Sequence, residues 1–320
     1  MKAIQITRYG PPEVLQLAEV DKPEPKRGEV RVRVHATTVC AGDVRIRKAD
    51  PFFLRVVSGG LFRPTKVRTP GMEFAGDVDA VGEGVSGFAV GDPVFGSTGL
   101  KFGANAEYVC APQSLLAAKP ADVPYERAAP VAFGGISALH YLRAAGLQAG
   151  QKLLVYGASG SVGTAAVQLG KHFGAHVTGV CSRGNLDLVR SLGADTVLDY
   201  AVDDYSRDWA IYDVVFDTVG KSDIKRGIRA LKRGGAYAFA VMSLVSYARV
   251  KLSAALTGRI RVIDGIARVR SADLAFLMQL IRGGSFTPVV DRMYPLGDIV
   301  AAHTYVDAGH KTGNVVVLVN

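Results

Sequence analysis

Short runs of alternating apolar and polar residues fill the first part of the chain, from Met1 to about Ala121. Stretches such as KAIQI, EVRVRVHATTV and NAEYVCAP have the two-residue period of strands with one buried face. Clusters such as YGPP and TPG separate these runs and predict turns. Residues 1–121 are therefore expected to form an all-β unit, a partly open barrel.

The period changes at about Val123, where apolar strands begin to alternate with helical patterns. The strand QKLLVYG is followed by SVGTAAVQLGKHFGA, whose apolar residues recur at helical spacing. Further strands are predicted in HVTGVC, DTVLDY, YDVVFDTVG, GGAYAFAV and RIRVIDGI. This alternation predicts a doubly wound parallel sheet over residues 122–267, and hence an α/β fold class. Residues 268–320 add a helix in SADLAFLMQLIRGG and a closing strand in NVVVLV.

The strand-to-helix turn VYGASGSVG, Val155 to Gly163, contains glycine at positions 157, 160 and 163. A glycine at position 160 lets the backbone approach a pyrophosphate, and Gly163 lets the helix pack closely on the strand. The helix N-terminus then offers N–H groups and the positive end of its dipole to phosphate. In a repeating strand–helix context this pattern favours a dinucleotide site over a plain turn.

The end of the next predicted strand, VTGVCSRGN, decides between the two nicotinamide cofactors. An acidic residue about 20 positions after the glycine loop would bind the ribose 2′-hydroxyl of NAD. This segment has none, whereas Ser182 and Arg183 can bind a 2′-phosphate. The pattern predicts NADP(H), although a solvated polar loop is the alternative. Tyr200, which ends the following strand, lies either beside the adenine or 2′-phosphate or simply on the rim.

Composition and charge exclude several classes of protein. The 320 residues carry a net charge of +9, but the basic residues are dispersed and no nucleic-acid-binding module is present. No apolar run is long enough for a membrane span, and the N-terminus lacks the features of a secretory signal, which favours the cytoplasm. Three widely spaced cysteines, Cys40, Cys110 and Cys181, argue against a disulfide framework and an all-cysteine zinc site.

Several motifs together resemble the medium-chain dehydrogenase/reductase superfamily over essentially the whole chain. They are PGMEFAGDVDAVGEGV, VGDPVFG, GASGSVG, LGAD, FDTVG and GHKTGNVVV. The resemblance implies a GroES-like barrel at 1–121, a Rossmann NADP-binding domain at 122–267, and a segment at 268–320 that returns to the barrel. The chain is most similar to the zinc-less quinone oxidoreductase branch, in particular to reticulon-interacting and chloroplast-envelope quinone-oxidoreductase-like proteins.

The same resemblance indicates whether the protein binds a catalytic zinc and which reaction it carries out. Cys40 occupies the first zinc-ligand place of the zinc-dependent members, but Met72 occupies the histidine place. No catalytic zinc is expected, and Cys40 is interpreted first as a small buried thiol. Without a metal to polarise an alcohol, the easier reaction is hydride transfer from NADPH to an electrophilic acceptor, a quinone or an α,β-unsaturated carbonyl compound.

Candidate site residues follow from matching positions in the family. Asp43 matches a recurring aspartate of the zinc-less branch and is, with Cys40, the candidate catalytic residue, although it can equally cap a turn. The residues expected at the pyrophosphate are Ser159, Gly160, Val162 and Gly163, and those expected at the 2′-phosphoadenosine are Ser182, Arg183 and Tyr200. Ser137 is expected near the nicotinamide end, and Val219 and Met242 at the carboxyl ends of strands. His310, Lys311 and Thr312 are expected to contribute to the NADP site from a C-terminal turn.

Other functions stay open at this point. One is an NAD(P)-dependent alcohol dehydrogenase acting through Cys40 and an unrecognised ligand, and another is a non-catalytic NADPH-binding scaffold protein. The strand RIRVIDGI is expected at a sheet edge, where relatives pair to form a homodimer. The apolar and basic stretch Asp50–Arg68 interrupts the barrel pattern and has two interpretations, a lid over a substrate cleft or a contact surface.

Overall fold

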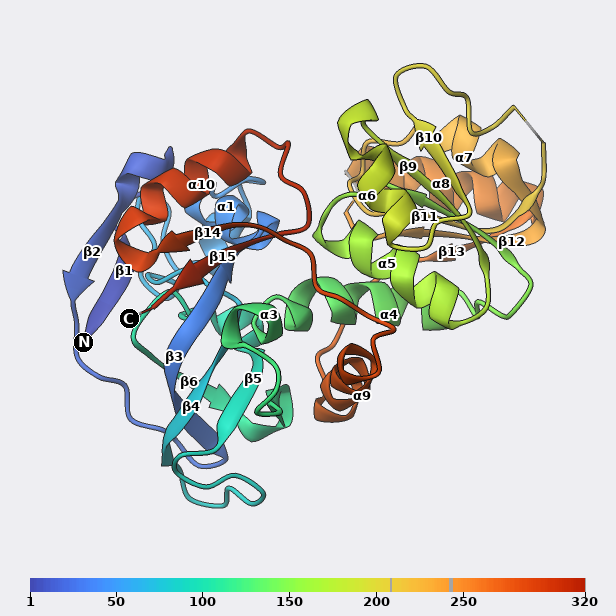
Figure 1. Ribbon diagram of the computed structural model, residues 1–320. Helices are drawn as coiled ribbons and strands as arrows, with labels where there is room; N and C mark the ends of the chain where they lie inside the picture. Colours follow the sequence, from blue (N-terminus) through green and yellow to red (C-terminus); the bar gives the residue numbers. More distant parts are fainter. Residues whose placement is uncertain (208, 242–243, 320) are drawn as a thin grey trace. The chain divides into compact units, whose positions relative to one another are not determined.

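The computed structural model describes residues 1–207, 209–241 and 244–319. The chain folds into two compact units (Figure 1). The first contains Met1–Phe133, Val269–Arg282 and the chain from Pro288 onward, and the second contains Gly134–Arg268 and Gly283–Thr287. None of the helices in the described part of the chain combines the length and apolar composition of a bilayer span.

The first unit is built on a curled, mostly antiparallel sheet. Its strands are β3 (Glu29–Val39), β4 (Glu73–Val81), β5 (Pro93–Ser97), β6 (Tyr108–Pro112), β7 (Leu116–Ala118), β14 (Val290–Pro295) and β15 (Asn314–Leu318), with β1 (Lys2–Ile6) and β2 (Leu15–Glu19) paired separately. The long strand β3 pairs with β6 along its first half and with β15 along its second, while β4 lies on its other edge. The C-terminal strands thus join the N-terminal sheet.

The structure describes five α-helices in this unit. They are α1 (Ala41–Lys48), α2 (Leu54–Val57), α3 (Tyr125–Ala128), α9 (Ser271–Arg282) and α10 (Ile299–Asp307). Of these, α1, α2 and α10 contribute side chains to one apolar core. The core combines alternate residues of β3, such as Val30, Val32 and Val34, with Phe74 of β4 and Val315 of β15. Burial of these alternate side chains removes apolar surface from water and stabilises the curled sheet.

The second unit is a six-stranded parallel sheet in the order β10-β9-β8-β11-β12-β13. Its elements are α4 (Ile136–Ala144), β8 (Lys152–Tyr156), α5 (Ser161–His172), β9 (His176–Cys181), α6 (Leu186–Ser191), β10 (Thr196–Asp199), β11 (Tyr212–Asp217), α7 (Ile224–Ala230), β12 (Leu231–Phe239), α8 (Leu244–Thr257) and β13 (Ile260–Ile263). The strand order reverses between β8 and β11. In open parallel sheets this reversal opens a crevice at the carboxyl ends of the strands, where dinucleotides bind.

The unit boundaries differ from those expected from the sequence. Residues 122–133 belong to the first unit rather than the second, because the Tyr125 hydroxyl donates to Asp77 and the Phe133 N–H donates to Glu73. Residues 283–287 belong to the second unit, because Thr287 and Gln168 exchange two hydrogen bonds. A composition shift along the chain does not reveal such contacts.

A buried polar cluster joins α1 to α10 inside the first unit. The Arg47 side chain is fully buried, pairs with Asp307 at 2.5 Å and donates to the Gly10 carbonyl. His303 is also fully buried, and neither of its ring nitrogens has a hydrogen-bond partner among the described residues. Burial and the neighbouring Arg47 lower the pKa of His303 to about 3.

This cluster should make the protein less stable in mild acid. Below pH 6.5 the unfolded chain protonates His303 while the folded chain does not, so the free energy of unfolding falls as the pH drops from 6.5 towards 3. At pH 5 this histidine alone should cost about 2 kcal/mol relative to pH 7. Urea unfolding at both pH values, for the parent and for His303→Leu, measures the effect. An unchanged pH dependence in His303→Leu would contradict the assignment.

A candidate dinucleotide-binding site

The glycine loop lies at the reversal of strand order in the parallel sheet. It leaves the carboxyl end of β8, and the loop after β11 lies directly beside it. A Cβ atom at Gly157 would lie 2.7 Å from both Thr218 Oγ1 and Val219 Cγ1. Val219 therefore lies after a strand end, next to the glycine loop.

Each glycine of the loop has a separate structural reason. Gly157 has a φ of +82°, a left-handed conformation that favours glycine. A Cβ at Gly163 would lie 2.0 Å from the Gly157 carbonyl oxygen, so only glycine lets α5 begin this close to the turn. Gly160 is the N-cap of α5, and a Cβ there would meet only the Gly157 oxygen, at 3.6 Å. The space beside Gly160 suits an approaching phosphate.

A second loop, after β9, is tied to the glycine loop by Asn185. The Asn185 side-chain amide donates to Ser159 Oγ at 3.2 Å and to Ser182 Oγ at 3.1 Å. The predicted pyrophosphate and 2′-phosphate residues are thus held together by one side chain. Asn185 was not singled out from the sequence. Its position three residues after Ser182 is, however, one from which an asparagine side chain can form local hydrogen bonds in a turn.

Arg183 and Tyr200 lie at the same end of the sheet. Arg183 opens a short 3-10 turn after β9 and is exposed. The Tyr200 N–H donates to the Cys181 carbonyl at 3.1 Å, which places Tyr200 beside the residue preceding Ser182, with its side chain 53% exposed. The structure therefore gathers Ser159, Ser182, Arg183 and Tyr200 around two adjoining loops.

Of two other cofactor residues predicted in this unit, Ser137 is described by the structure and Met242 is not. Ser137 is buried in the first turn of α4, a helix that packs against α5. The preceding turn touches the start of α5, since a Cβ at Gly134 would lie 2.5 Å from Ser161 Oγ. Met242 lies outside the described residues.

Asp43 in the first unit has both carboxylate oxygens engaged by the backbone. It accepts from the Cys40 N–H at 2.8 Å and from the Gly71 N–H at 2.7 Å, and it is fully buried. This arrangement caps α1 and joins the Cys40 turn to the segment before β4. The geometry corresponds to the capping alternative for Asp43.

The predicted C-terminal residues lie in the turn before β15. The Thr312 N–H donates to Asp291 at 2.7 Å, and the Lys311 ammonium donates to the Gly313 carbonyl. Burial lowers the pKa of Lys311, while the nearby Cys40 and Glu73 oppose this shift. His310, Lys311 and Thr312 are described within the first unit, with Lys311 close to the Cys40 turn.

Glu73 is a buried acid that the sequence did not single out. Thr38 Oγ1 donates to it at 2.7 Å and the Phe133 N–H at 2.6 Å. Burial nevertheless raises the pKa of Glu73 to about 8. The sequence could have pointed to Glu73, because it directly follows Met72, the residue at the histidine place of zinc-dependent members.

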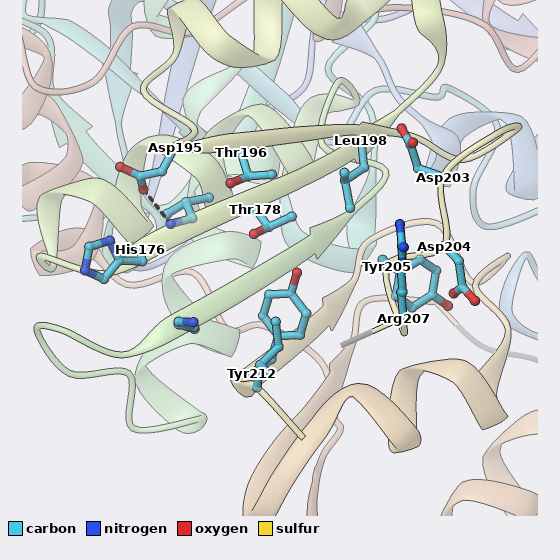
Figure 2. A pocket seen from close by; sticks show the side chains of 13 residues that line it. His176, Thr178, Asp195, Thr196, Leu198, Asp203, Asp204, Tyr205, Arg207 and Tyr212 are labelled. Carbon is cyan, nitrogen blue, oxygen red and sulfur yellow. Dashed lines mark hydrogen bonds between the residues drawn. The ribbon is translucent and has the colours of Figure 1, made fainter. Parts of the chain in front are cut away.

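A pocket of about 510 Å³ lies elsewhere on the second unit (Figure 2). Its lining includes Thr178 of β9, Thr196 and Leu198 of β10, Tyr205 of the crossover to β11, and Tyr212 at the start of β11. The described residues of that crossover, between β10 and β11, contain no helix, and the pocket opens beside them. Its lining includes none of the residues predicted for the cofactor.

Comparison with known proteins identifies the family. Residues 26–121 match the alcohol dehydrogenase GroES-like domain, and residues 192–317 match a zinc-binding dehydrogenase domain. The chain is 31% identical to 2-methylene-furan-3-one reductase of Solanum lycopersicum, over 99% of this chain and 79% of that protein. The chain belongs to the medium-chain dehydrogenase/reductase superfamily.

Further members of this superfamily are similar over the same span. NADPH-dependent alkenal/one oxidoreductase of Arabidopsis thaliana, a chloroplastic protein, is 31% identical over 99% of this chain and 79% of its own length. The solved quinone oxidoreductase of Coxiella burnetii superposes with a TM-score of 0.90 at 28% identity, covering 100% of this chain and 99% of that one. The GroES-like and Rossmann domains expected from the sequence are confirmed.

Zinc-dependent members of the superfamily raise the question of a metal, and the residues present do not fit one. The Cys40 Sγ lies 4.0 Å from the Met72 Sδ, and burial raises the pKa of the Cys40 thiol well above its usual range. A methionine thioether is a poor partner for zinc, which prefers cysteine, histidine and carboxylate ligands. In the described residues, no three His, Cys, Asp or Glu side chains are arranged to hold a metal ion.

Proposed function

We propose that the protein reduces quinones or α,β-unsaturated carbonyl compounds with NADPH and without zinc. The observation that carries this proposal is the pair of joined loops at the strand-order reversal. A glycine cradle for pyrophosphate adjoins a loop that offers Ser182 and Arg183 where an NAD enzyme has an acid. The names of the alkenal/one and quinone oxidoreductase relatives support the acceptor class.

The residues expected from the sequence are proposed for the following roles, in both units. The backbone of Ser159, Gly160, Val162 and Gly163 would hold the pyrophosphate at the start of α5. Ser182 and Arg183 would bind the 2′-phosphate, and the exposed Tyr200 ring would cover the adenosine. When bound, NADPH supplies the hydride. Ser137, Val219 and Met242 are proposed for the nicotinamide side, and His310, Lys311 and Thr312 for a contribution from the C-terminal turn.

A reaction without zinc needs an acceptor that is already electrophilic, such as a quinone or enone. Asp43 is proposed as a positioning residue, because its carboxylate holds the Cys40 turn against Gly71. Cys40 is kept as a candidate on its position alone, and burial raises the pKa of its thiol. The alcohol dehydrogenase alternative is not favoured, since Cys40 has no ligand set around it in the described residues.

The cofactor assignment is tested by titrating the purified protein with NADPH and with NADH, following the fluorescence of the reduced nicotinamide. Arg183→Ala should weaken NADPH binding about thirtyfold and leave NADH binding unchanged, because one charge-assisted contact to the 2′-phosphate is lost. The matched control is Arg190→Ala, which removes an exposed arginine of α6 that pairs with Asp187. It should change neither affinity.

Two results would contradict the proposed function, the first at the cofactor and the second at the reaction. Equal affinity of the parent for NADPH and NADH would make Ser182 and Arg183 a surface turn only. Tight NADPH binding with no turnover of any quinone or enone would favour the scaffold alternative. The cytoplasmic location expected from the sequence stays a prediction.

A homodimer is also proposed, through the edge strand β13. This strand pairs with β12 and ends the six-stranded sheet, and an exposed edge rich in Val and Ile is prone to pair with another chain. Pairing of two β13 strands across a two-fold axis would join two sheets into one. Sedimentation velocity should give two chains per particle, and a single chain at micromolar concentration would refute the dimer.

A further inference from the structure

The segment between α1 and β4 exposes a group of large apolar side chains to which the proposed function assigns no role. Their exposed fractions are 65% for Phe52, 58% for Phe53, 73% for Val56, 55% for Leu61 and 87% for Phe62. Side chains of this size are usually buried, and several together mark an interaction surface. These five residues are called the apolar tip below.

Local hydrogen bonds hold the apolar tip in a defined shape. Backbone bonds from Leu54 to Pro51, from Arg55 to Phe52 and from Val56 to Phe53 make a helical turn that continues into α2. Residues 52, 53 and 56 share one face of this turn, and Leu54, on the other, packs against the core. The chain then folds back, because the Thr65 and Lys66 N–H groups both donate to the Ser58 carbonyl, which leaves Leu61 and Phe62 at the end of the loop.

Arg55 connects the helical turn of the segment to the loop that contains Leu61. Its guanidinium donates to the Leu61 carbonyl at 2.6 Å and lies 4.8 Å from the Phe52 ring centroid and 5.1 Å from that of Tyr9. The Tyr9 hydroxyl donates to the Gly60 carbonyl at 2.8 Å. The apolar side chains are therefore presented outward by an ordered scaffold.

Apart from the exposed Asp50 at its start, the segment carries only positive side-chain charges. Between Pro51 and Gly71 the sequence contains no Asp or Glu and four cations, of which Arg63, Lys66 and Arg68 are exposed. Exposed cations beside exposed phenylalanines complement a surface that combines negative charge with an apolar layer beneath it. Anionic phospholipid headgroups over acyl chains have this composition.

We propose that the apolar tip docks the protein on an anionic lipid surface. Phe52, Phe53, Val56, Leu61 and Phe62 enter the boundary between headgroups and acyl chains, while Arg63, Lys66 and Arg68 contact lipid phosphates. A fluid acyl layer accepts phenylalanines without a shaped partner pocket, whereas an acidic protein partner would need one. Docking of this kind is peripheral, and it does not depend on the proposed reaction.

The test is flotation of the full chain with phosphatidylcholine vesicles that contain or lack phosphatidylglycerol. We expect binding to the anionic vesicles, weaker binding to the neutral ones, and release by high salt, because screening weakens the cationic contacts. The double variant Phe53→Ser/Phe62→Ser should bind anionic vesicles about a hundredfold more weakly, at about tenfold for each phenylalanine withdrawn from the acyl boundary. Lys66→Gln/Arg68→Gln should weaken binding to anionic vesicles about thirtyfold, at about 1 kcal/mol for each cation removed.

Matched controls come from the same unit. Val90→Ser removes an apolar side chain that is 67% exposed, and Arg27→Gln removes a cation that is 81% exposed, both outside the segment. Neither should change vesicle binding. All replaced side chains are exposed, and thermal melts should confirm that the variants fold like the parent.

A second measurement locates the contact directly. Phe62→Trp adds an indole at the apolar tip, which should be quenched by brominated phosphatidylcholine in the anionic vesicles. The native Trp209 of the second unit, 67% exposed, should not be quenched. The proposal is overturned if the parent does not float with anionic vesicles, if the double variant floats equally, or if Trp209 alone is quenched. The parent would fail to float if the segment instead served as a lid, as a docking site for another protein, or as a contact with a second copy of this chain.

Discussion

Gly163→Ala should abolish measurable NADPH binding, an expected loss of at least a hundredfold in affinity. The added Cβ would lie 2.0 Å from the Gly157 carbonyl oxygen and 2.8 Å from two backbone atoms of Ala158. These neighbours are backbone, so the start of α5 must move away from the turn. Since the pyrophosphate would be held by N–H groups of that first turn, a displacement of the helix removes several contacts together.

Nicotinamide fluorescence titration measures this loss, and a thermal melt of the same sample separates it from unfolding. The matched control is Gly297→Ala, because a Cβ at Gly297 would have nothing within 4 Å. It should bind NADPH like the parent. Normal affinity in Gly163→Ala would mean that the loop is not where the pyrophosphate binds.

Asp307→Ala should lower the free energy of unfolding by about 3 kcal/mol, a large fraction of the stability of an ordinary domain. The substitution leaves the fully buried Arg47 guanidinium without its carboxylate partner, with the Gly10 carbonyl as its remaining acceptor. Lys48, which also pairs with Asp307, is 41% exposed and can be rehydrated. The expected loss therefore comes mainly from one unpaired buried cation.

Urea unfolding followed by circular dichroism gives the comparison. Asp187→Ala is the control, because Asp187 pairs with Arg190 on the surface and its side chain is 97% exposed. Exposed pairs of this kind contribute little, so no measurable change is expected. A similar small effect in Asp307→Ala would show that water reaches Arg47.

The parallel sheet was predictable because its signals are local. Each strand after Val123 is a short apolar run, and the glycine loop is recognisable without any knowledge of distant contacts. The strands β2 (Leu15–Glu19) and β7 (Leu116–Ala118) were missed, since LQLAE and LAA are too short and mixed to show a period. Helix α8 was missed as well, and its apolar residues show no single face.

The site was predictable where one motif supplies it and not where two segments meet. Ser159 and Ser182 were singled out separately, but their connection through Asn185 depends on how β8 and β9 align. The engagement of both Asp43 oxygens depends on Gly71, which is distant in sequence. Burial of Glu73 and its raised pKa likewise require the surrounding β strands to be in place.

The last strand, β15, lies inside its sheet between β14 and β3 rather than at an edge. A protein is made from its N-terminus, so β3 and β4 leave the ribosome long before Asn314–Leu318 can pair with Ala36–Val39. During synthesis the second half of β3 therefore has an unsatisfied edge, and the nascent chain depends on protection there until Asn314–Leu318 has emerged. A nonsense mutation shortly before Asn314 would consequently leave the first-made half of the protein open to aggregation.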